Sequence, residues 1–308
     1  MASSKPSSVK SKKSRNKKID KHHPEFELTY DMMLGIRTTV GQIESKPLQK
    51  LTPAAMDIAI KRPFPHIGAS RFGVTFSGSG DTPAHEMRDF KFKDYSPEVF
   101  RHIRSRFNIN PADYLLCVCG NFQYLEFISN SKSGQFFFYT YDRSFVVHNK
   151  FRQYMIKTIT RDEARFLRKI LPAYYHVRSV LHRTLQHIMK NPNTLLTRYY
   201  GMHRVKPHKK KEVHFLIMGS VFYTRRFIHV TFDLKGSKVG REATAKEKSS
   251  ASCVFKDNDF LSMNVGIKVG AQRAAILNQQ IAADVEFLRL LKIMDYSLLL
   301  GLHYKDRP

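Results

Sequence analysis

The stretch Lys292-Ile293-Met294-Asp295-Tyr296-Ser297-Leu298-Leu299-Leu300-Gly301 sets a single carboxylate, that of Asp295, before an apolar run. Upstream of it, apolar residues at helical spacing predict a helix over about residues 279–291. Taken alone, Asp295 would be an ordinary cap between that helix and a following strand. A catalytic carboxylate is the alternative, and that role requires partners elsewhere in the chain.

The charge balance of the 308 residues is strongly basic. Lys and Arg number 52 against 26 Asp and Glu, which gives a formal net charge of +26. Such an excess attracts polyanions, whether nucleic acid, anionic lipid or a nucleotide, and does not choose among them. No nucleic-acid-binding signature accompanies the charge, so we expect no nucleic-acid partner. The length suits roughly two domains of about 150 residues, or one two-lobed unit.

The three cysteines, Cys117, Cys119 and Cys253, lack the spacing of a disulfide framework, which favours a reducing compartment. Cys117 and Cys119 could suggest a metal, but a structural zinc site needs four ligands and no second Cys/His pair stands at suitable spacing. We therefore expect buried thiols. The sequence contains no apolar stretch of about 18 residues, so we expect no membrane span. The N-terminus also lacks the apolar segment of a secretory signal. These observations predict an intracellular protein, either soluble or peripheral to a membrane.

Local patterns predict an arm, helices and a long loop in the first third of the chain. Residues 1–24 are rich in Ser, Lys and Asn and cannot bury much apolar area, so we expect a disordered basic arm. Apolar spacing predicts a helix from Phe26 to Gln42, and the Pro- and Gly-rich residues 61–88 predict a loop. Ser96-Pro97-Glu98 and Asn110-Pro111 each have the composition of a helix start.

A hairpin is predicted next, where two aromatic-rich runs, residues 122–128 and 135–141, flank a small polar segment. Phosphoryl transfer needs a flexible loop over the phosphates, a lysine that holds them and a carboxylate that orients the nucleophile. The hairpin tip, which includes Ser133 and Gly134, could supply that loop. A single glycine in a hairpin is more often just a turn.

A lysine, an acidic residue and a hinge follow the hairpin in the order that kinases use. Lys157 stands on a predicted strand, Glu163 completes a capping box with Thr160, and residues 213–218 predict an apolar hinge strand ending at Met218. Each has a simpler explanation, because a strand lysine is often a solvated edge residue and Glu163 is already explained as a cap. The His-Arg-Asp and Asp-Phe-Gly signatures of protein kinases are absent, which disfavours an ordinary protein kinase.

Two longer motifs decide between these interpretations. Phe232-Asp233-Leu234-Lys235-Gly236-Ser237, with Gly240-Arg241-Glu242-Ala243 after it, resembles the Asp-Leu-Lys-Gly-Ser…Arg-Glu-Ala stretch of phosphatidylinositol phosphate kinases. Met294-Asp295-Tyr296-Ser297-Leu298-Leu299 resembles that family's catalytic motif. Three more strings resemble the family in its own order: Phe90-Lys91-Phe92-Lys93-Asp94-Tyr95-Ser96-Pro97-Glu98-Val99-Phe100-Arg101, Asn191-Pro192-Asn193-Thr194-Leu195-Leu196 and Lys256-Asp257-Asn258-Asp259-Phe260. The resemblance covers most of residues 25–304.

The resemblance implies roles for residues at the matching positions. Lys157 would hold the phosphates of ATP, Lys235 would reach the transferring phosphate or the lipid headgroup, and Asp295 would orient the inositol hydroxyl or accept its proton. ATP and Mg²⁺ are the implied cofactors, with no metal ligand assigned within this chain. The remaining residues implied in nucleotide binding are Ser133, Gly134, Glu163, Met218 and Asp233.

The resemblance also implies the fold. We expect the α+β, two-lobed fold of phosphatidylinositol phosphate kinases, which is SAICAR synthase-like, with an antiparallel-sheet N-lobe over residues 25–218. Residues 219–308 would form an incomplete C-lobe, because the family's Ile-Ile-Asp segment, which binds Mg²⁺, and its basic activation loop come after the position of Pro308. Residues 145–153 and 178–188 exceed the family pattern, either as natural insertions or as translated intron.

Among the branches of the family, the similarity is greatest to type I, phosphatidylinositol-4-phosphate 5-kinases, especially fungal members. It rests on Tyr30-Asp31-Met32-Met33-Leu34-Gly35-Ile36-Arg37 and on Ile109-Asn110-Pro111 with Asp113-Tyr114-Leu115. The implied product is phosphatidylinositol 4,5-bisphosphate, made on anionic membranes at the inner face of the plasma membrane, with a nuclear pool and a homodimer as further expectations. The alternative is a non-catalytic, truncated module that binds phosphoinositide membranes or a full-length relative.

Overall fold

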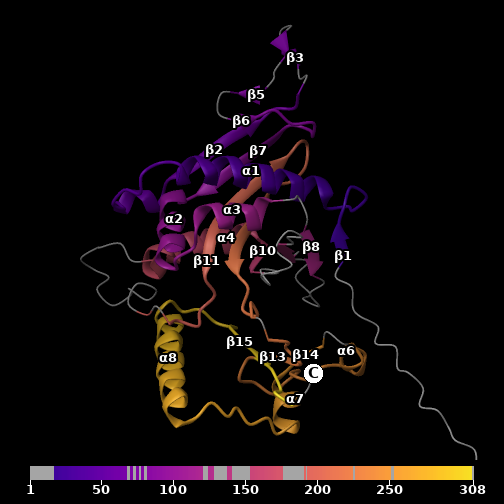
Figure 1. Ribbon diagram of the computed structural model, residues 1–308, viewed down its shortest axis with the longest axis vertical. Coiled ribbons are helices and arrows are strands. Elements are labelled where there is room, and N and C mark those ends of the chain that lie inside the picture. Colours follow the sequence, from indigo (N-terminus) through magenta and orange to yellow (C-terminus); the bar gives the residue numbers. More distant parts are fainter. Residues whose placement is uncertain are drawn as a thin grey trace, which may run out of the picture. The chain divides into compact units, whose positions relative to one another are not determined.

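The computed structural model forms two compact units (Figure 1). The larger unit comprises Lys17–Tyr223 and Gly270–Ile293, and the smaller comprises Thr224–Val269 and the residues from Met294 onward. The structure describes residues 17–67, 70–71, 74–75, 78–79, 82–120, 124–127, 137–140, 153–175, 191, 193–224, 226–250 and 253–306.

The larger unit is built on an eight-stranded antiparallel sheet in the order β1-β8-β9-β10-β12-β11-β7-β2. The predicted hairpin is confirmed, since β8 pairs antiparallel with β9. The expected α+β class with an antiparallel sheet is also confirmed. The strands are β1 Lys17–Ile19, β2 Ala59–Phe64, β7 Phe90–Tyr95, β8 Tyr124–Phe127, β9 Phe137–Thr140, β10 Tyr154–Ile159, β11 Tyr199–Pro207 and β12 Val213–Gly219.

Two boundaries drawn from composition differ from the structure. Residues 61–64, assigned to the predicted loop, belong to β2. The prediction was wrong there because β2 is the edge strand of its sheet, where Pro63 removes no essential hydrogen bond. Four two-residue strands follow: β3 Ser70–Arg71, β4 Val74–Thr75, β5 Gly78–Ser79 and β6 Thr82–Pro83. Residues 17–19 of the expected arm form β1, whose Ile19 is buried against the core. Residues 1–16 lie outside the described part.

Helices cover this sheet, and the predicted starts at Ser96 and Asn110 are confirmed. The Asn110 side chain accepts the Asp113 backbone N–H at 3.1 Å, as an N-cap does. Cys117 and Cys119, expected to be buried thiols, are buried in α3 and belong to no disulfide within the described residues. The elements are α1 Phe26–Glu44, the 3₁₀ turn η1 Pro53–Met56, α2 Pro97–Arg106, α3 Pro111–Cys119, α4 Arg161–Tyr175 and α8 Ala271–Leu290.

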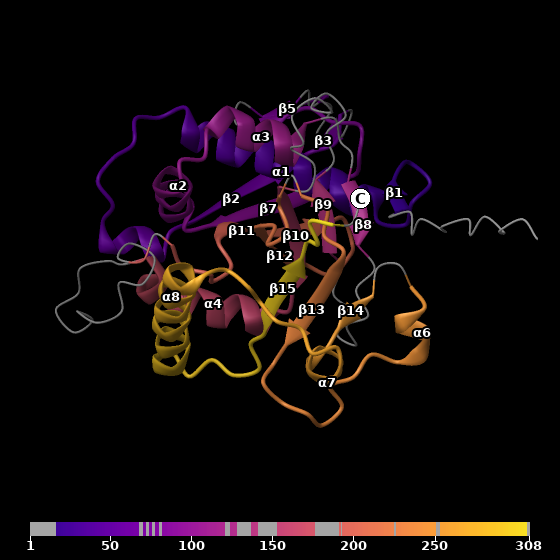
Figure 2. The same ribbon diagram turned by 60° about the horizontal axis from the view of Figure 1, so that its bottom comes forward.

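The two faces of the sheet bear different helices (Figure 2). On one face Gly35 of α1 packs against the ring of Phe92, which also meets Phe215 edge-on at 6.1 Å. On the other face α4 packs over Met202 and Leu216, which are directly paired between β11 and β12. Because side chains alternate along each strand, residues in register with Leu216 lie on the α4 face.

Helix α8 belongs to the larger unit although its sequence lies within the expected C-lobe. It starts at Ala271, earlier than the sequence suggested, and Phe287 reaches the core. Asp284, which is 5% exposed, accepts hydrogen bonds from Thr194 Oγ1 at 2.6 Å and from the Leu195 backbone N–H at 2.8 Å. This buried carboxylate ties α8 to residues 194–195, so the predicted boundary at residue 218 does not divide the chain as its contacts do.

The smaller unit contains a three-stranded sheet in the order β14-β13-β15, with one parallel and one antiparallel pair. Phe232 of β13 is fully buried and packs against Phe255 and Phe260. No helix in the described part of either unit is long and apolar enough to cross a bilayer. The elements are β13 Val230–Leu234, α6 Ala245–Lys248, β14 Val254–Phe255, α7 Asp257–Ser262 and β15 Leu298–Leu302.

Gly35 and Gly41 of α1 provide a matched test of the α1–sheet contact. A Cβ added at Gly35 would overlap the ring of buried Phe92, whereas one at Gly41 would have its nearest neighbour, Leu115 Cδ1, at 3.8 Å. We predict that Gly35→Ala lowers the free energy of unfolding by about 1–3 kcal/mol through overpacking. Gly41→Ala should raise it by up to ~1 kcal/mol, because alanine favours the helix. Urea unfolding measures both, and equal stability of the two variants would contradict this packing.

Asp31 of α1 is 4% exposed and lines a small cavity of ≈10 Å³ with Glu27, Arg88, His208 and Lys210 among its walls. Burial raises the pKa of its carboxyl to about 8; the Glu27 carboxylate adds to this effect and the Lys210 ammonium opposes it. An unfolded Asp titrates near 3.8. Between these values the folded chain holds a proton that the unfolded chain does not, so stability falls as pH rises.

We predict that Asp31→Asn removes much of this pH dependence. The wild-type slope attributable to Asp31 is at most about 1.4 kcal/mol per pH unit between about pH 4 and pH 8, and the amide does not titrate. Chemical unfolding at several pH values measures the difference between the two proteins. A constant stability difference from pH 5 to pH 8 would show that Asp31 is ionised throughout.

Candidate active site

In the larger unit, Lys157 and Met218 lie on the α4 face of the sheet. Lys157 of β10 pairs directly with Leu216 of β12, and Met155 pairs with Met218. Because alternate residues of a strand share a face, Lys157 and Met218 lie on the face where α4 packs. The Lys157 side chain is partly buried, as expected for a cation on a half-covered surface.

Glu163 lies in the first turn of α4, on the same side of the sheet. Its carboxylate accepts the Thr160 backbone N–H at 2.7 Å, and its own N–H donates to Thr160 Oγ1 at 3.2 Å. This is the predicted capping box. The sequence order of lysine strand, acidic helix start and hinge strand thus places Lys157, Glu163 and Met218 on one side of one sheet.

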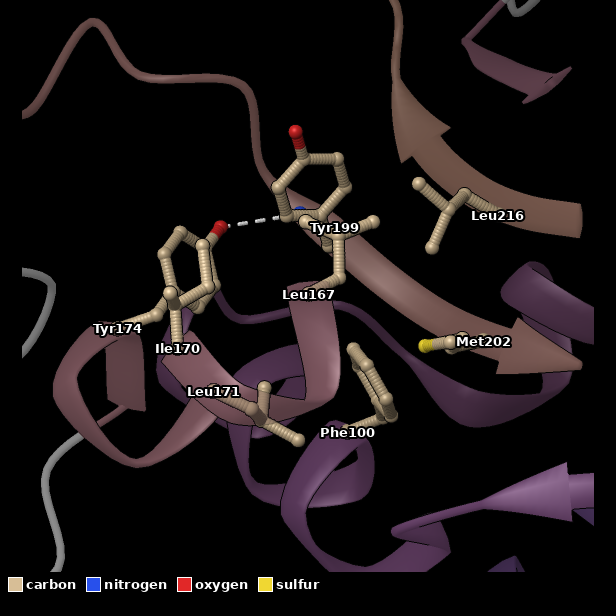
Figure 3. Close-up of a pocket in the computed structure, with 8 residues that line it drawn as sticks. All are labelled: Phe100, Leu167, Ile170, Leu171, Tyr174, Tyr199, Met202 and Leu216. Carbon is tan, nitrogen blue, oxygen red and sulfur yellow. Dashed lines mark hydrogen bonds between the residues drawn. The ribbon is translucent and has the colours of Figure 1, made fainter. Parts of the chain in front are cut away.

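An apolar cavity of ≈20 Å³ lies between α4 and this face (Figure 3). The Tyr174 hydroxyl accepts the Tyr199 backbone N–H at 3.1 Å beside it and donates to the Thr197 carbonyl at 3.0 Å. The cavity has room for about one water and is far too small for a nucleotide. It is a packing defect of the core, with this lining: Phe100, Leu167, Ile170, Leu171, Tyr174, Tyr199, Met202 and Leu216.

In the smaller unit, sheet register brings together two predicted site residues that are 60 positions apart in sequence. Leu234, the last residue of β13, pairs with Leu298, the first residue of β15. Lys235 therefore leaves the sheet at the edge where residue 297 enters it. Lys235 Nζ donates to Asp295 Oδ1 at 2.5 Å.

The Lys235–Asp295 pair is accessible to solvent. The side chains are 27% and 80% exposed, respectively. The hydrogen bond from Lys235 and its positive charge hold the pKa of Asp295 below its usual range, so the carboxylate is ionised at neutral pH. Asp295 has a φ of +59°, a left-handed conformation that Asp tolerates better than most residues. The arrangement offers a cation and an ionised carboxylate side by side on an open surface.

Asp257, in the first turn of α7, organises the backbone beside Lys235, a role that the sequence did not reveal. Its Oδ1 accepts the backbone N–H of Lys235 at 3.0 Å and that of Gly236 at 2.8 Å, and its Oδ2 accepts Arg241 Nε at 2.8 Å. Arg241 also donates to the carbonyl oxygen of Asp233. Partial burial alone would raise the pKa of Asp257, but Arg241 and the two N–H groups lower it below the usual range.

Asp233 has a subsidiary place in this arrangement. Its Oδ2 lies 3.6 Å from the Arg241 guanidinium. Its Oδ1 is buried and accepts no hydrogen bond within the described part of the chain. Such an orphaned oxygen is a candidate ligand position for a cation, although the described residues contain no cluster of three or more His, Cys, Asp or Glu side chains suited to a metal.

The predicted site residues therefore divide between the units. Lys157, Glu163 and Met218 belong to the larger unit, and Asp233, Lys235 and Asp295 belong to the smaller one. Ser133 and Gly134 lie outside the described residues, as do residues 178–188 and 145–152 of the two suspected insertions. Asp257 and Arg241 stand in strings that the family resemblance singled out, but an acidic residue in a first helical turn signals by itself only a helix start.

Comparison with known proteins shows which family the chain resembles. A family described as Phosphatidylinositol-4-phosphate 5-Kinase matches residues 118–308. A probable phosphatidylinositol phosphate kinase of Dictyostelium discoideum is 38% identical over 99% of this chain and 42% of its own length. Phosphatidylinositol 4-phosphate 5-kinase its3 of Schizosaccharomyces pombe is 38% identical over 94% of the chain and 35% of its own length. Phosphatidylinositol 4-phosphate 5-kinase 9 of Arabidopsis thaliana is 36% identical over 96% of the chain and 33% of its own length. The chain thus spans roughly a third to two-fifths of the length of these relatives.

Proposed function

Since the chain belongs to the phosphatidylinositol-4-phosphate 5-kinase family, we propose that it serves the ATP-dependent phosphorylation of phosphatidylinositol 4-phosphate at the inositol 5-hydroxyl. The observation that carries the proposal is the Lys235–Asp295 pair, which joins the family's two signature motifs through a 2.5 Å hydrogen bond. A position on an open edge suits a substrate that stays in a lipid surface.

The proposed roles follow from the charges. Asp295, held ionised by Lys235, orients the 5-hydroxyl and takes its proton as the hydroxyl oxygen forms a bond to the γ-phosphorus of ATP. The bond from the γ-phosphorus to the bridging oxygen breaks, and ADP leaves. Lys235 offsets negative charge on the transferring group, and Lys157 acts as a point charge for the ATP phosphates. The products are ADP and phosphatidylinositol 4,5-bisphosphate.

Mg²⁺ is part of the proposal, because phosphoryl transfer needs neutralisation of phosphate charge. This ion usually keeps several waters and takes one or two carboxylates together with substrate phosphates. Asp233, with its unpaired buried oxygen, is a carboxylate of the smaller unit that would suit this role. When bound, the ion would supply positive charge beside the transferring phosphoryl group.

The net charge of +26 supports a membrane setting. Basic residues near an anionic cytoplasmic leaflet contribute about 1 kcal/mol each to binding. We accordingly propose that the protein acts at the inner face of the plasma membrane, with a nuclear pool as a secondary location. We also propose a homodimer, which the family resemblance implies.

A lipid kinase assay tests the proposal. With phosphatidylinositol 4-phosphate vesicles, ATP and Mg²⁺, we predict that Asp295→Asn lowers bisphosphate formation roughly 10²–10⁴-fold, the usual range for loss of a general base. Asp306→Asn, which changes an exposed aspartate of the same unit, is the control and should keep wild-type activity. A wild-type chain that binds the vesicles without forming product would instead favour a non-catalytic membrane-binding module. Full activity in Asp295→Asn would remove the proposed role of Asp295.

A further inference from the structure

We propose that Asp257 is a positioning residue that holds the Lys235 loop in the conformation from which Lys235 reaches Asp295. The inference concerns the site of the proposed function and rests on it for its biochemical meaning. Its physical content is independent of turnover, because it concerns which group holds the Lys235–Asp295 pair together.

Lys235 lies just beyond the last paired residue of β13, where strand pairing no longer fixes the backbone. The β13–β15 ladder ends at the Leu234–Leu298 pair, so the following backbone needs other partners. Asp257 Oδ1 supplies them by accepting the N–H groups of both Lys235 and Gly236. Gly236 has a φ of +72° and open space beside its Cα, so the turn depends on glycine's freedom at this point.

Asp257 is itself held in place by other contacts. It is 8% exposed and begins α7, and its second oxygen accepts Arg241 Nε at 2.8 Å. Arg241 in turn holds the Asp233 carbonyl at the end of β13. A carboxylate that accepts hydrogen bonds from two N–H groups and a guanidinium is favoured in its ionised form and is constrained in orientation, so it can support the loop.

The Lys235–Asp295 ion pair is too weak to hold the Lys235 side chain in place by itself. Its partners are 27% and 80% exposed, and ion pairs in water gain little over their separated, hydrated groups. A flexible lysine side chain also loses rotamer freedom when it is held in one place. The short contact therefore depends on a backbone that already directs Lys235 toward Asp295, and that backbone is bonded to Asp257.

Asp259 provides a matched control in the same helix turn. It is 1% exposed and likewise accepts two backbone N–H groups, those of Ala243 and Lys256, and one ammonium, that of Lys248. None of these partners is in the Lys235 loop. Loss of Asp259 should therefore disturb α7 as much as loss of Asp257 does, without acting on Lys235 directly.

The test is the pKa of Asp295, followed by NMR titration of ¹³C-labelled aspartate carboxyls in the 308-residue chain and assigned with Asp295→Asn. Lys235→Met defines the full effect, since removal of the ammonium raises the pKa of Asp295 toward its ordinary value. We expect Asp257→Ala to raise it by at least half as much. Asp259→Ala should leave it close to wild type.

Two results would overturn the proposal: Asp257→Ala leaves the titration of Asp295 unchanged while Lys235→Met shifts it, or Asp257→Ala and Asp259→Ala shift it equally. If Asp257→Ala fails to fold by circular dichroism, Asp257→Asn takes its place. The amide oxygen can still accept hydrogen bonds from the backbone, but the amide nitrogen cannot accept one from Arg241. We therefore expect a smaller rise in the pKa of Asp295, and no rise would again contradict the proposal. A chain inactive as a kinase would still give this titration, so failure of the proposed function and failure of the positioning role are separate outcomes.

Discussion

The antiparallel pairing of β13 with β15 is the constraint on which the candidate site depends. It joins Leu234 to Leu298 and so brings the residues beyond each strand end to one edge of a small sheet. Lys235 and Asp295 meet there although 60 residues separate them. Fully buried Phe232, packed against Phe255 and Phe260, anchors β13 and thereby fixes the edge from which Lys235 emerges. Hydrophobic burial under the sheet thus determines where the charges at its end can be.

In the smaller unit, the buried carboxylates have more hydrogen-bond partners than the exposed carboxylate of Asp295. Asp259 and Asp257 are buried and fully engaged with N–H groups and cations, whereas Asp295 is open to solvent with one lysine beside it. Buried carboxylates need such partners to remain charged. An exposed carboxylate does not, so Asp295 can exchange its lysine contact for another hydrogen-bond donor at small cost.

The sequence predicted those features that local chemistry determines. The capping box of Thr160 and Glu163, the N-cap at Asn110 and the β8–β9 hairpin each depend on a few neighbouring residues, and each was found. The edge strand β2 was missed because the tolerance for Pro63 depends on which strand lies outermost, a property of the whole sheet. The attachment of α8 through Asp284, and of Asp257 to the Lys235 loop, are long-range contacts of ordinary polar residues, which leave no periodic signal.

We propose that this chain carries residues of the phosphoryl-transfer site of a phosphatidylinositol-4-phosphate 5-kinase. The most direct measurement is the position of the new phosphate. The lipid product made from phosphatidylinositol 4-phosphate and γ-labelled ATP is deacylated, and its headgroup is identified by chromatography against inositol phosphate standards. We expect label on the 5-position of a 4,5-bisphosphate. Label at the 3-position, or no labelled bisphosphate, would contradict it.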